Sequence, residues 1–217
     1  DLSISLPLLT PQGAQMRYEW PWGVWTDGKR LAAVATHGKA ILFWNSLPLH
    51  DSQPPDYTIS LPQFGTIRNI STDGSTYFFF GDHNGGINGD HPVTYFWNTF
   101  PTKSNQPYDF SRDEWVKGVK LSDGKLAAGG LASVYVWNKV PTIATQNPDL
   151  VLQNPYYKNG DGPDVVQAGG RLYINNYNGN NVLVYNSFPD SPNRLPDFAL
   201  GSPSVTTNTL DLMNYIQ

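Results

Sequence analysis

The sequence predicts an all-β fold, a β-propeller made of four-stranded antiparallel blades. Three observations lead to this prediction: a five-residue motif occurs four times, an aspartate follows every copy at a constant distance, and the segments between copies alternate like short strands. The copies recur at intervals of 40 to 53 residues. Repeats of this length that hold four short strands are typical of propeller blades, whose stacking buries both faces of each small sheet.

The motif reads aromatic-Asn-x-x-Pro, and the aspartate lies 11 residues after its Asn in every copy. The copies begin at Trp44, Trp97, Trp137 and Tyr185, and the aspartates are Asp56, Asp109, Asp149 and Asp197. We expect the aromatic residue to end the third strand of a blade and to pack between blades, while Asn and Pro shape the turn. The aspartate should accept backbone N–H groups where the outer strand begins. A group repeated at equivalent rim positions cannot converge on one site, so its role is structural.

The fourth repeat shows the strand pattern most clearly. Residues 172–177 and 182–185 are runs rich in β-branched and aromatic residues on either side of an Asn/Gly turn, which is the pattern of a hairpin. Residues 164–167 and 197–200 supply two further short strands. No window has the capped i, i+3, i+4, i+7 spacing of an amphipathic helix, so we expect few helices.

Two segments resemble NHL-type repeats: Trp22 to Leu31, and Gly162 to Tyr185. A blade of that family reads Pro-x-Gly-Val, a turn, Leu-Tyr-Val-Ala-Asp and Asn-Asn-Arg-Val. The resemblance extends over essentially the whole chain, with Asn176 in place of the usual Asp and without the Arg after the Asn pair. It implies a propeller, commonly of six blades, and no single activity. NHL-like propellers include protein-binding and RNA-binding modules, receptor ectodomains and a few lyases, with relatives by fold among calcium lactonases.

The predicted blades cover residues 20–61, 66–114, 116–153 and 163–200. Because Asp1 to Leu6 matches Asp56 to Leu61, residues 1–6 are expected to form the outer strand of a preceding blade. Residues 201–217 are expected to be an interblade connection or a tail. Four complete blades and a partial one favour a larger ring, six-bladed by the resemblance, over a closed ring of four. Oligomerisation through the open edges is the alternative.

Composition excludes several classes of protein. The 217 residues include 14 Lys and Arg, 18 Asp and Glu, and no Cys, which excludes disulfide scaffolds and thiolate metal sites. An acidic chain without clustered cations is not expected to bind nucleic acid. The apolar runs are far shorter than the roughly 20 residues that span a bilayer, so no membrane insertion is expected. Only 15% of residues are charged, and polarity carried by Asn, Ser and Thr favours an extracellular or periplasmic location.

The first candidate site is an insertion in the second repeat, residues 81–91, which is longer than its counterparts in the first and fourth repeats. Carboxylates and amide oxygens suit Ca²⁺, and imidazoles suit transition metals, although a solvated Gly/Asn-rich loop is the alternative. An inserted surface loop contributes little to a core, so replacing Asp82 and Asp90 by Ala should leave folding intact. The candidate ligand-binding residues are Asp82, His83, Asn84, Asn88, Asp90 and His91.

Two further segments are candidates. The linker 154–164 contains Tyr156 and Tyr157, and its Asp161 and Asp164 join Asp82 and Asp90 as candidate calcium ligands, with turn formation as the alternative. The amide cluster around Asn176 and Tyr177 could stack on a sugar ring and hydrogen bond to its hydroxyls. We expect Trp20, Trp22 and Trp25 to lie beside this cluster, with core packing as the alternative.

These features predict a non-enzymatic extracellular binding module that presents a loop-lined face to a protein or glycan partner. No catalytic residue is assigned, because no Ser or carboxylate spacing suggests a triad. One alternative is a secreted metal-dependent propeller enzyme, lyase-like or lactonase-like, with calcium in the central channel. Such an enzyme should place carboxylates and His at the channel mouth in at least three blades, whereas the second repeat alone supplies both. A structural assembly protein is the other alternative.

Overall fold

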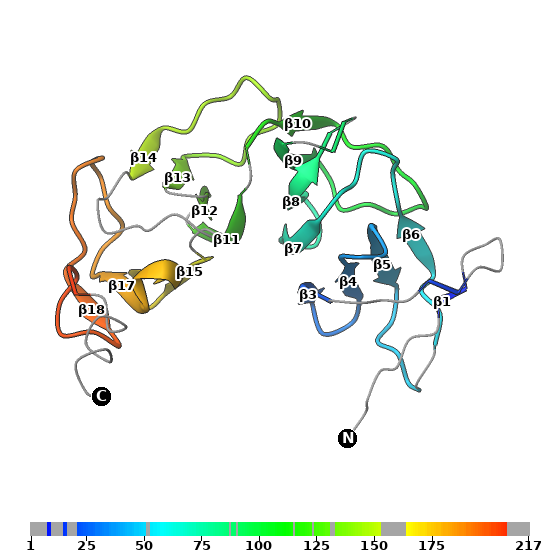
Figure 1. Ribbon diagram of the computed structural model, residues 1–217, viewed down its shortest axis with the longest axis horizontal. Helices are drawn as coiled ribbons and strands as arrows, with labels where there is room; N and C mark the ends of the chain where they lie inside the picture. The colour runs from blue at the N-terminus through cyan, green and yellow to red at the C-terminus, as the bar shows by residue number, and fades with distance from the viewer. Residues whose placement is uncertain are drawn as a thin grey trace. The chain divides into compact units, whose positions relative to one another are not determined.

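The computed structural model describes residues 8–9, 15–16, 21–50, 53–86, 88–89, 91–114, 116–122, 124–130, 133–152 and 164–207. This part of the chain is all-β, and it contains the four four-stranded antiparallel sheets that the repeats predict (Figure 1). The chain divides into two compact units, Asp1–Trp115 and Val116–Gln217, each with two of these blades. The predicted outer strand at residues 1–6 and the end of the tail, residues 208–217, lie outside the described residues.

In the first unit, a short pair of strands, β1 (Leu8–Leu9) and β2 (Gln15–Met16), precedes two blades. In each blade, the strands pair in chain order as a meander. The first blade consists of β3 (Gly23–Thr26), β4 (Leu31–Ala35), β5 (Ala40–Trp44) and β6 (Tyr57–Ile59), and the second of β7 (Ile67–Thr72), β8 (Phe78–Gly85), β9 (His91–Trp97) and β10 (Phe110–Arg112).

The second unit repeats the same plan. The third blade consists of β11 (Lys117–Ser122), β12 (Lys125–Gly129), β13 (Val134–Trp137) and β14 (Leu150–Leu152), and the fourth of β15 (Asp164–Ala168), β16 (Arg171–Asn176), β17 (Asn181–Tyr185) and β18 (Phe198–Leu200). Within the described residues, the one helix is a 3₁₀ turn, η1 (Tyr177–Gly179), at the predicted hairpin turn of the fourth blade. No helix in the described ranges is long and apolar enough to cross a bilayer.

The core of each unit lies between its two blades. Side chains alternate along a strand, so each blade has one set of residues on either face. In the first unit, Phe43 packs against Phe78 with ring centroids 5.5 Å apart, and Phe80 stacks with Trp97 at 5.7 Å. In the second unit, Leu172, Ile174 and Leu183 of the fourth blade share a buried cluster with Val134, Val136 and Leu152 of the third. The apolar runs of the sequence therefore become interblade contacts.

The repeated motif forms the predicted turn in every blade. The aromatic residue ends the third strand, and its ring N–H or hydroxyl donates to the carbonyl oxygen nine residues later, as in Trp97 Nε1 to Gln106 O at 3.1 Å. The aspartate accepts the backbone N–H of the motif Asn. These N–O distances are 2.6 Å for Asn45 and Asp56, 2.7 Å for Asn98 and Asp109, 2.7 Å for Asn138 and Asp149, and 2.8 Å for Asn186 and Asp197. The structural role assigned to these aspartates is confirmed.

A glutamine that sequence inspection missed completes this turn in three blades. The side-chain oxygen of Gln106 accepts the backbone N–H of Thr102 at 3.0 Å, and Gln53 and Gln146 make the same contact with Leu49 and Thr142. In the fourth blade, Arg194 takes the place of this glutamine and forms an ion pair with Asp197 at 2.9 Å. The outer turn is thus held by hydrogen bonds within its own dozen residues.

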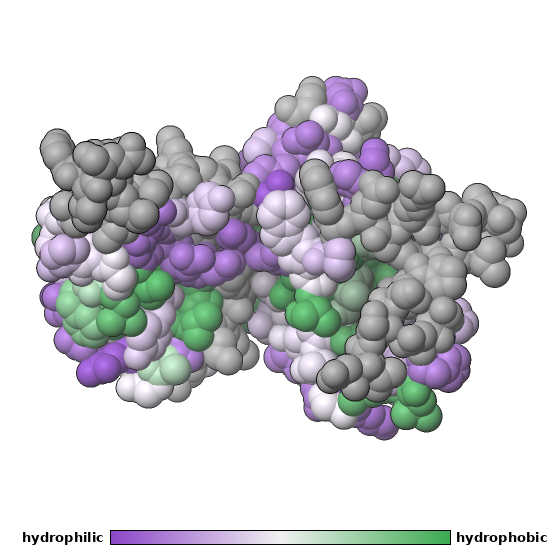
Figure 2. Space-filling view, turned by 60° about the horizontal axis from the view of Figure 1, so that its bottom comes forward, coloured by the Kyte–Doolittle hydropathy of each residue, from purple (hydrophilic) through white to green (hydrophobic). Residues whose placement is uncertain are grey.

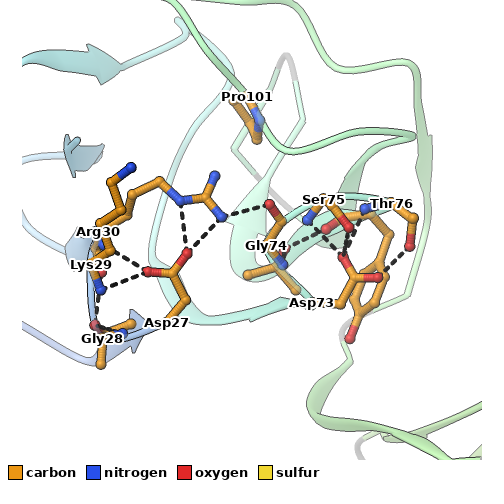
Figure 3. Close-up of polar contacts among 12 residues, drawn as sticks. Asp27, Gly28, Lys29, Arg30, Asp73, Gly74, Ser75, Thr76 and Pro101 are labelled. Carbon is orange, nitrogen blue, oxygen red and sulfur yellow. Dashed lines mark hydrogen bonds and ion pairs between the residues drawn. The ribbon is translucent and has the colours of Figure 1, made fainter. Parts of the chain in front are cut away.

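In the first and second blades, the turn between the first two strands is held by another carboxylate, Asp27 or Asp73 (Figure 3). Asp27 accepts the backbone N–H groups of Lys29 and Arg30 at 3.0 and 2.7 Å, and also the Arg30 side chain at 2.9 Å. Arg30 then reaches the second blade, where it donates to the carbonyl oxygen of Gly74 at 2.8 Å and lies over the Phe100 ring at 4.4 Å. This arginine therefore joins the first-blade turn to the second blade.

We predict that replacing Asp109 by Ala lowers the free energy of unfolding by about 1 kcal/mol, because the Asn98 N–H loses its acceptor at the start of the outer strand. Urea unfolding measures this loss. Asp113→Ala is the control, because that carboxylate is 86% exposed and its contact with His91 is long, at 3.6 Å. Equal effects of the two substitutions would contradict the role given to the repeated aspartate.

A second prediction concerns acid stability. The N–H groups of Arg30, its guanidinium and the N–H of Lys29 hold the pKa of Asp27 at about 2, below the usual 3.8. A carboxyl whose pKa is lower in the folded protein stabilises the fold above the unfolded pKa, and loses this effect as the pH falls through the folded pKa. Asp27→Asn should therefore lower the melting temperature at pH 6, with a difference that shrinks between pH 4 and 2. A difference that is independent of pH would show that the charge of Asp27 does not contribute.

Candidate functional site

The candidate site is a polar cleft of about 420 Å³ within the first unit. Three segments line it: the turn between β4 and β5, the connection from β6 to β7, and the turn between β8 and β9. The second-to-third-strand turns and the interblade connection thus meet at one end of the first two blades, as expected for a loop-lined face. The lining residues are Thr36, His37, Lys39, Pro62, Gln63, Phe64, Gly65, Thr66, Asn84, Gly86, Asn88 and Gly89.

Asp82 builds the wall of this cleft. Its buried carboxylate accepts the backbone N–H groups of Gly65 and Thr66, both at 2.7 Å, and that of Asn84 at 3.1 Å. Burial raises the pKa of Asp82, whereas these N–H groups and the positive charge of Lys39 act in the opposite direction. One carboxylate therefore ties the interblade connection to the end of β8.

A tyrosine and two glycines complete this frame. The Tyr95 hydroxyl donates to the carbonyl oxygen of Gln63 at 3.1 Å and accepts the N–H of Gly86 at 2.9 Å, and burial raises its pKa to about 12. Gly86 has a φ of +82°, which favours glycine. A Cβ on Gly65 would lie 1.8 Å from the Asn84 carbonyl oxygen, so the connection and the strand end approach more closely than any side chain allows.

Four side chains at the cleft are not part of this frame. Lys39, Asn84 and Asn88 are exposed and Gln63 is half-buried. None of the four side chains hydrogen bonds to another described residue. Their ammonium and amide groups are therefore available to a ligand.

The insertion differs from the surface loop that the sequence predicts. Residues 81–85 belong to β8 and β9 begins at His91, so much of the insertion extends a hairpin. Asp82 is fully buried in β8, so the premise on which intact folding of Asp82→Ala was expected, an exposed position on a surface loop, is wrong. His83 is half-buried, and its N–H donates to the Thr66 carbonyl oxygen at 3.1 Å. Of the predicted site residues in this segment, Asn84 and Asn88 line the cleft. Asp90 lies outside the described residues.

The other predicted residues are dispersed. In the first unit, His91 lies beside Asp113, with 3.6 Å between Nε2 and Oδ1, and does not line the cleft. In the second unit, Asp164 lies 3.7 Å from the Lys117 ammonium group. Tyr156, Tyr157 and Asp161 fall outside the described ranges. Where the structure does describe the chain, no three His, Asp or Glu side chains are grouped as metal ligands.

The amide cluster of the fourth blade is divided. Asn176 is buried and donates to Asn181 at 3.1 Å, whereas Tyr177 is 61% exposed and lines a second hollow of about 680 Å³ with Asn175. The tryptophans expected beside this cluster belong to the other unit. There Trp22 lies under the Arg68 guanidinium at 3.8 Å, and Trp25 packs on Phe100 at 5.0 Å. Trp20 is not among the described residues.

The second hollow lies on a face of the fourth blade whose equivalent in the first blade is covered by the second blade. Asn175, Val182 and Leu200 pair across the fourth blade at the positions that Val34, Ile41 and Ile59 occupy in the first. The first-blade residues are buried against the second blade, whereas Leu200 is 49% exposed. In the face shown in Figure 2, the coloured hydrophobic side chains form small groups among hydrophilic ones.

Sequence inspection missed every cleft residue outside the insertion, among them Thr36, Lys39 and Gln63. Thr36 Oγ1 donates to the Ile67 carbonyl oxygen at 2.8 Å across the two blades. One weak signal was present in the sequence: Pro62, in the connection after β6, is matched by Pro203 after β18.

Comparison with known proteins supports the fold. No family model matches the sequence. The structure is similar to a protein assigned as a 6-phosphogluconolactonase from Bacteroides fragilis, with a TM-score of 0.54 and 13% identity over 89% of this chain and 60% of that one. It is also similar to virginiamycin B lyase from Staphylococcus aureus, with a TM-score of 0.50 and 11% identity over 84% and 56%. A chain of the ctPRC2 complex matches with a TM-score of 0.50 and 12% identity over 79% and 36%.

These similarities show a fold of the β-propeller type. The chain spans between about a third and three fifths of the length of these three structures. At such low identity, they transfer no activity to this chain.

We predict that Asp82→Ala lowers the free energy of unfolding by about 3 kcal/mol, because it leaves three backbone N–H groups without their acceptor. Urea unfolding measures the loss. Asn84→Ala is the control two residues away on the same strand, and its exposed side chain should contribute little. A loss below 1 kcal/mol for Asp82→Ala would contradict the assigned role.

Proposed function

We propose that the chain is a non-enzymatic binding module that holds its ligand in the cleft of the first unit. The observation that supports this proposal is that some polar groups of the cleft hold its backbone, whereas others make no hydrogen bond to a described residue. Asp82 and Tyr95 fix the backbone of two cleft segments, while Lys39, Gln63, Asn84 and Asn88 are left for contacts with a ligand. A fixed frame that presents uncommitted polar side chains is the arrangement expected of a binding site.

Binding is favoured over catalysis by the position of the acidic group. General acid–base catalysis needs a carboxyl or imidazole that reaches the substrate. The Asp82 carboxylate is instead directed to backbone N–H groups behind the cleft wall. His37 is the one imidazole in the described lining, and no Asp or Glu lines the cleft together with it. The alternative of a calcium-dependent lyase-like or lactonase-like enzyme stays a prediction. A melting temperature that falls on addition of EDTA would support that alternative.

The proposal includes a larger ring of NHL-type blades, six in number, and a location outside the cell. Support for the ring comes from the fourth blade, which exposes Leu200 and Val166 at positions equivalent to Ile59 and Trp25, two residues packed in the first-unit core. A further blade would cover this face in the way that the second blade covers the first. The low share of charged residues supports the extracellular part of this proposal.

The binding site can be tested by NMR titration of the isotope-labelled chain with a panel of neutral and acidic oligosaccharides and acidic peptides. We expect one class of probe to shift the amide signals of residues 36–39, 62–66 and 84–89 together, and to be recovered unchanged. Asn88→Ala should weaken this response, whereas Lys103→Ala on the exposed outer turn of the second blade should not. Shifts confined to other residues, or turnover of the probe, would overturn the proposal.

A further inference from the structure

We propose that the cleft recognises a saccharide that carries a carboxylate, such as a uronic acid unit of an acidic polysaccharide. This inference rests on the proposed function and adds the chemical class of the ligand. Three properties of the cleft support it: its amide groups, its charge, and the scarcity of exposed apolar side chains in its lining.

The amides favour a ligand with several hydroxyl groups. Each amide side chain offers two N–H donors and one acceptor oxygen, which match the combined donor and acceptor character of neighbouring sugar hydroxyls. Gln63, Asn84 and Asn88 bring three such groups to one cleft from two different segments. Other amides of this chain serve the fold: Gln53, Gln106, Gln146 and Asn105 each accept a backbone N–H group. The cleft amides have no such task within the described structure.

The charge of the cleft favours an anionic ligand. Lys39 is exposed at the cleft, and the described lining contains no carboxylate that would repel an anion. Among the described residues, the Asp82 carboxylate interacts with the charge of Lys39, but it lies behind the cleft wall with three N–H groups around it. A ligand carboxylate would meet the ammonium group of Lys39.

The lining argues against a peptide as the main ligand. Peptide and protein interfaces depend on aromatic and aliphatic anchors that fill apolar pockets. The one aromatic residue among the described lining residues, Phe64, is 1% exposed, because it packs into the core against Phe80. The apolar contact left at the surface is Pro62. A volume of about 420 Å³ lies within the range of small-ligand sites and is suited to a short saccharide.

Isothermal titration calorimetry of the whole chain would test this inference with three probes: trigalacturonate, the matched neutral galactotriose, and a hexapeptide of glutamate. We expect trigalacturonate to bind about tenfold more tightly than galactotriose, because one charge-assisted hydrogen bond contributes about 1.5 kcal/mol. Raising the salt concentration from 20 to 200 mM should lower the affinity for the acidic sugar more than that for the neutral one, because salt screens exposed charges.

Matched variants assign the effect to the cleft. Lys39→Asn should reduce the affinity for trigalacturonate about tenfold, to that of galactotriose. Asn suits this position because Lys39 has a φ of +49°, a region that Asn adopts readily. Lys103→Asn, on the exposed outer turn of the second blade, is the control and should leave the affinity unchanged. Asn84→Ala should lower the affinity for both sugars by the same factor, because it removes contacts to hydroxyl groups and leaves the charge of the cleft unchanged.

The outcomes separate this inference from the proposed function. Equal binding of the two sugars, or no effect of Lys39→Asn, would overturn the acidic ligand class while the cleft remained a binding site. Tighter binding of the glutamate peptide than of trigalacturonate would overturn the inference that the ligand is a saccharide. Binding of trigalacturonate that neither Lys39→Asn nor Asn84→Ala changes would overturn both the ligand class and the site.

Discussion

The structure depends on the packing of one blade against the next. A sheet of four short strands has two faces and cannot shield either by itself, so its apolar side chains are buried when a second sheet covers them. In the first unit, this contact is a dense cluster of aromatic rings contributed by both blades, with Phe43, Phe78 and Trp97 among its members. In the second unit, aliphatic residues such as Leu172 and Val134 form the corresponding contact between the third and fourth blades. The two units therefore follow one plan with different side chains.

Once the sheets are packed, carboxylates hold the turns at their ends. At the outer rim, each blade has an aspartate that accepts the N–H of the motif Asn, and this bond closes a turn of constant length. Asp27 acts within a short turn of the first blade. Asp82 differs from both, because it is buried and joins segments that belong to two structural elements. Burying a carboxylate is costly unless hydrogen bonds compensate, and its three N–H partners provide that compensation.

The cleft follows from the same arrangement. The interblade connection must leave β6 and enter β7, so it passes the turn of one blade and the hairpin of the next. Asp82 and Tyr95 fix its backbone there, and the side chains that project from the same segments are not needed for the fold. Stability and the proposed binding therefore depend on different residues of the same strand end: Asp82 is directed inward, and Asn84, two positions later, lies at the cleft.

The sequence by itself determined the repeat and its local chemistry. The 11-residue spacing from Asn45 to Asp56 predicts a hydrogen-bonded turn, because both partners lie within one short segment, and the structure has this bond in all four blades. The number of strands per blade and the place of Trp44 at a strand end follow from the same local pattern. Such features can be predicted because neighbouring residues decide them.

Tertiary structure alone decided which polar residues form the site. Asp82, Asn84 and Asn88 have similar composition and lie close in the sequence, so pattern cannot tell the buried carboxylate from the exposed amides. The length of β8 and its pairing with β7 and β9 place Asp82 against the connection. Lys39 and Gln63 are far apart in the chain and share a cleft because two blades pack together. Long-range packing sets this geometry, so the spacing of residues in the sequence cannot predict it.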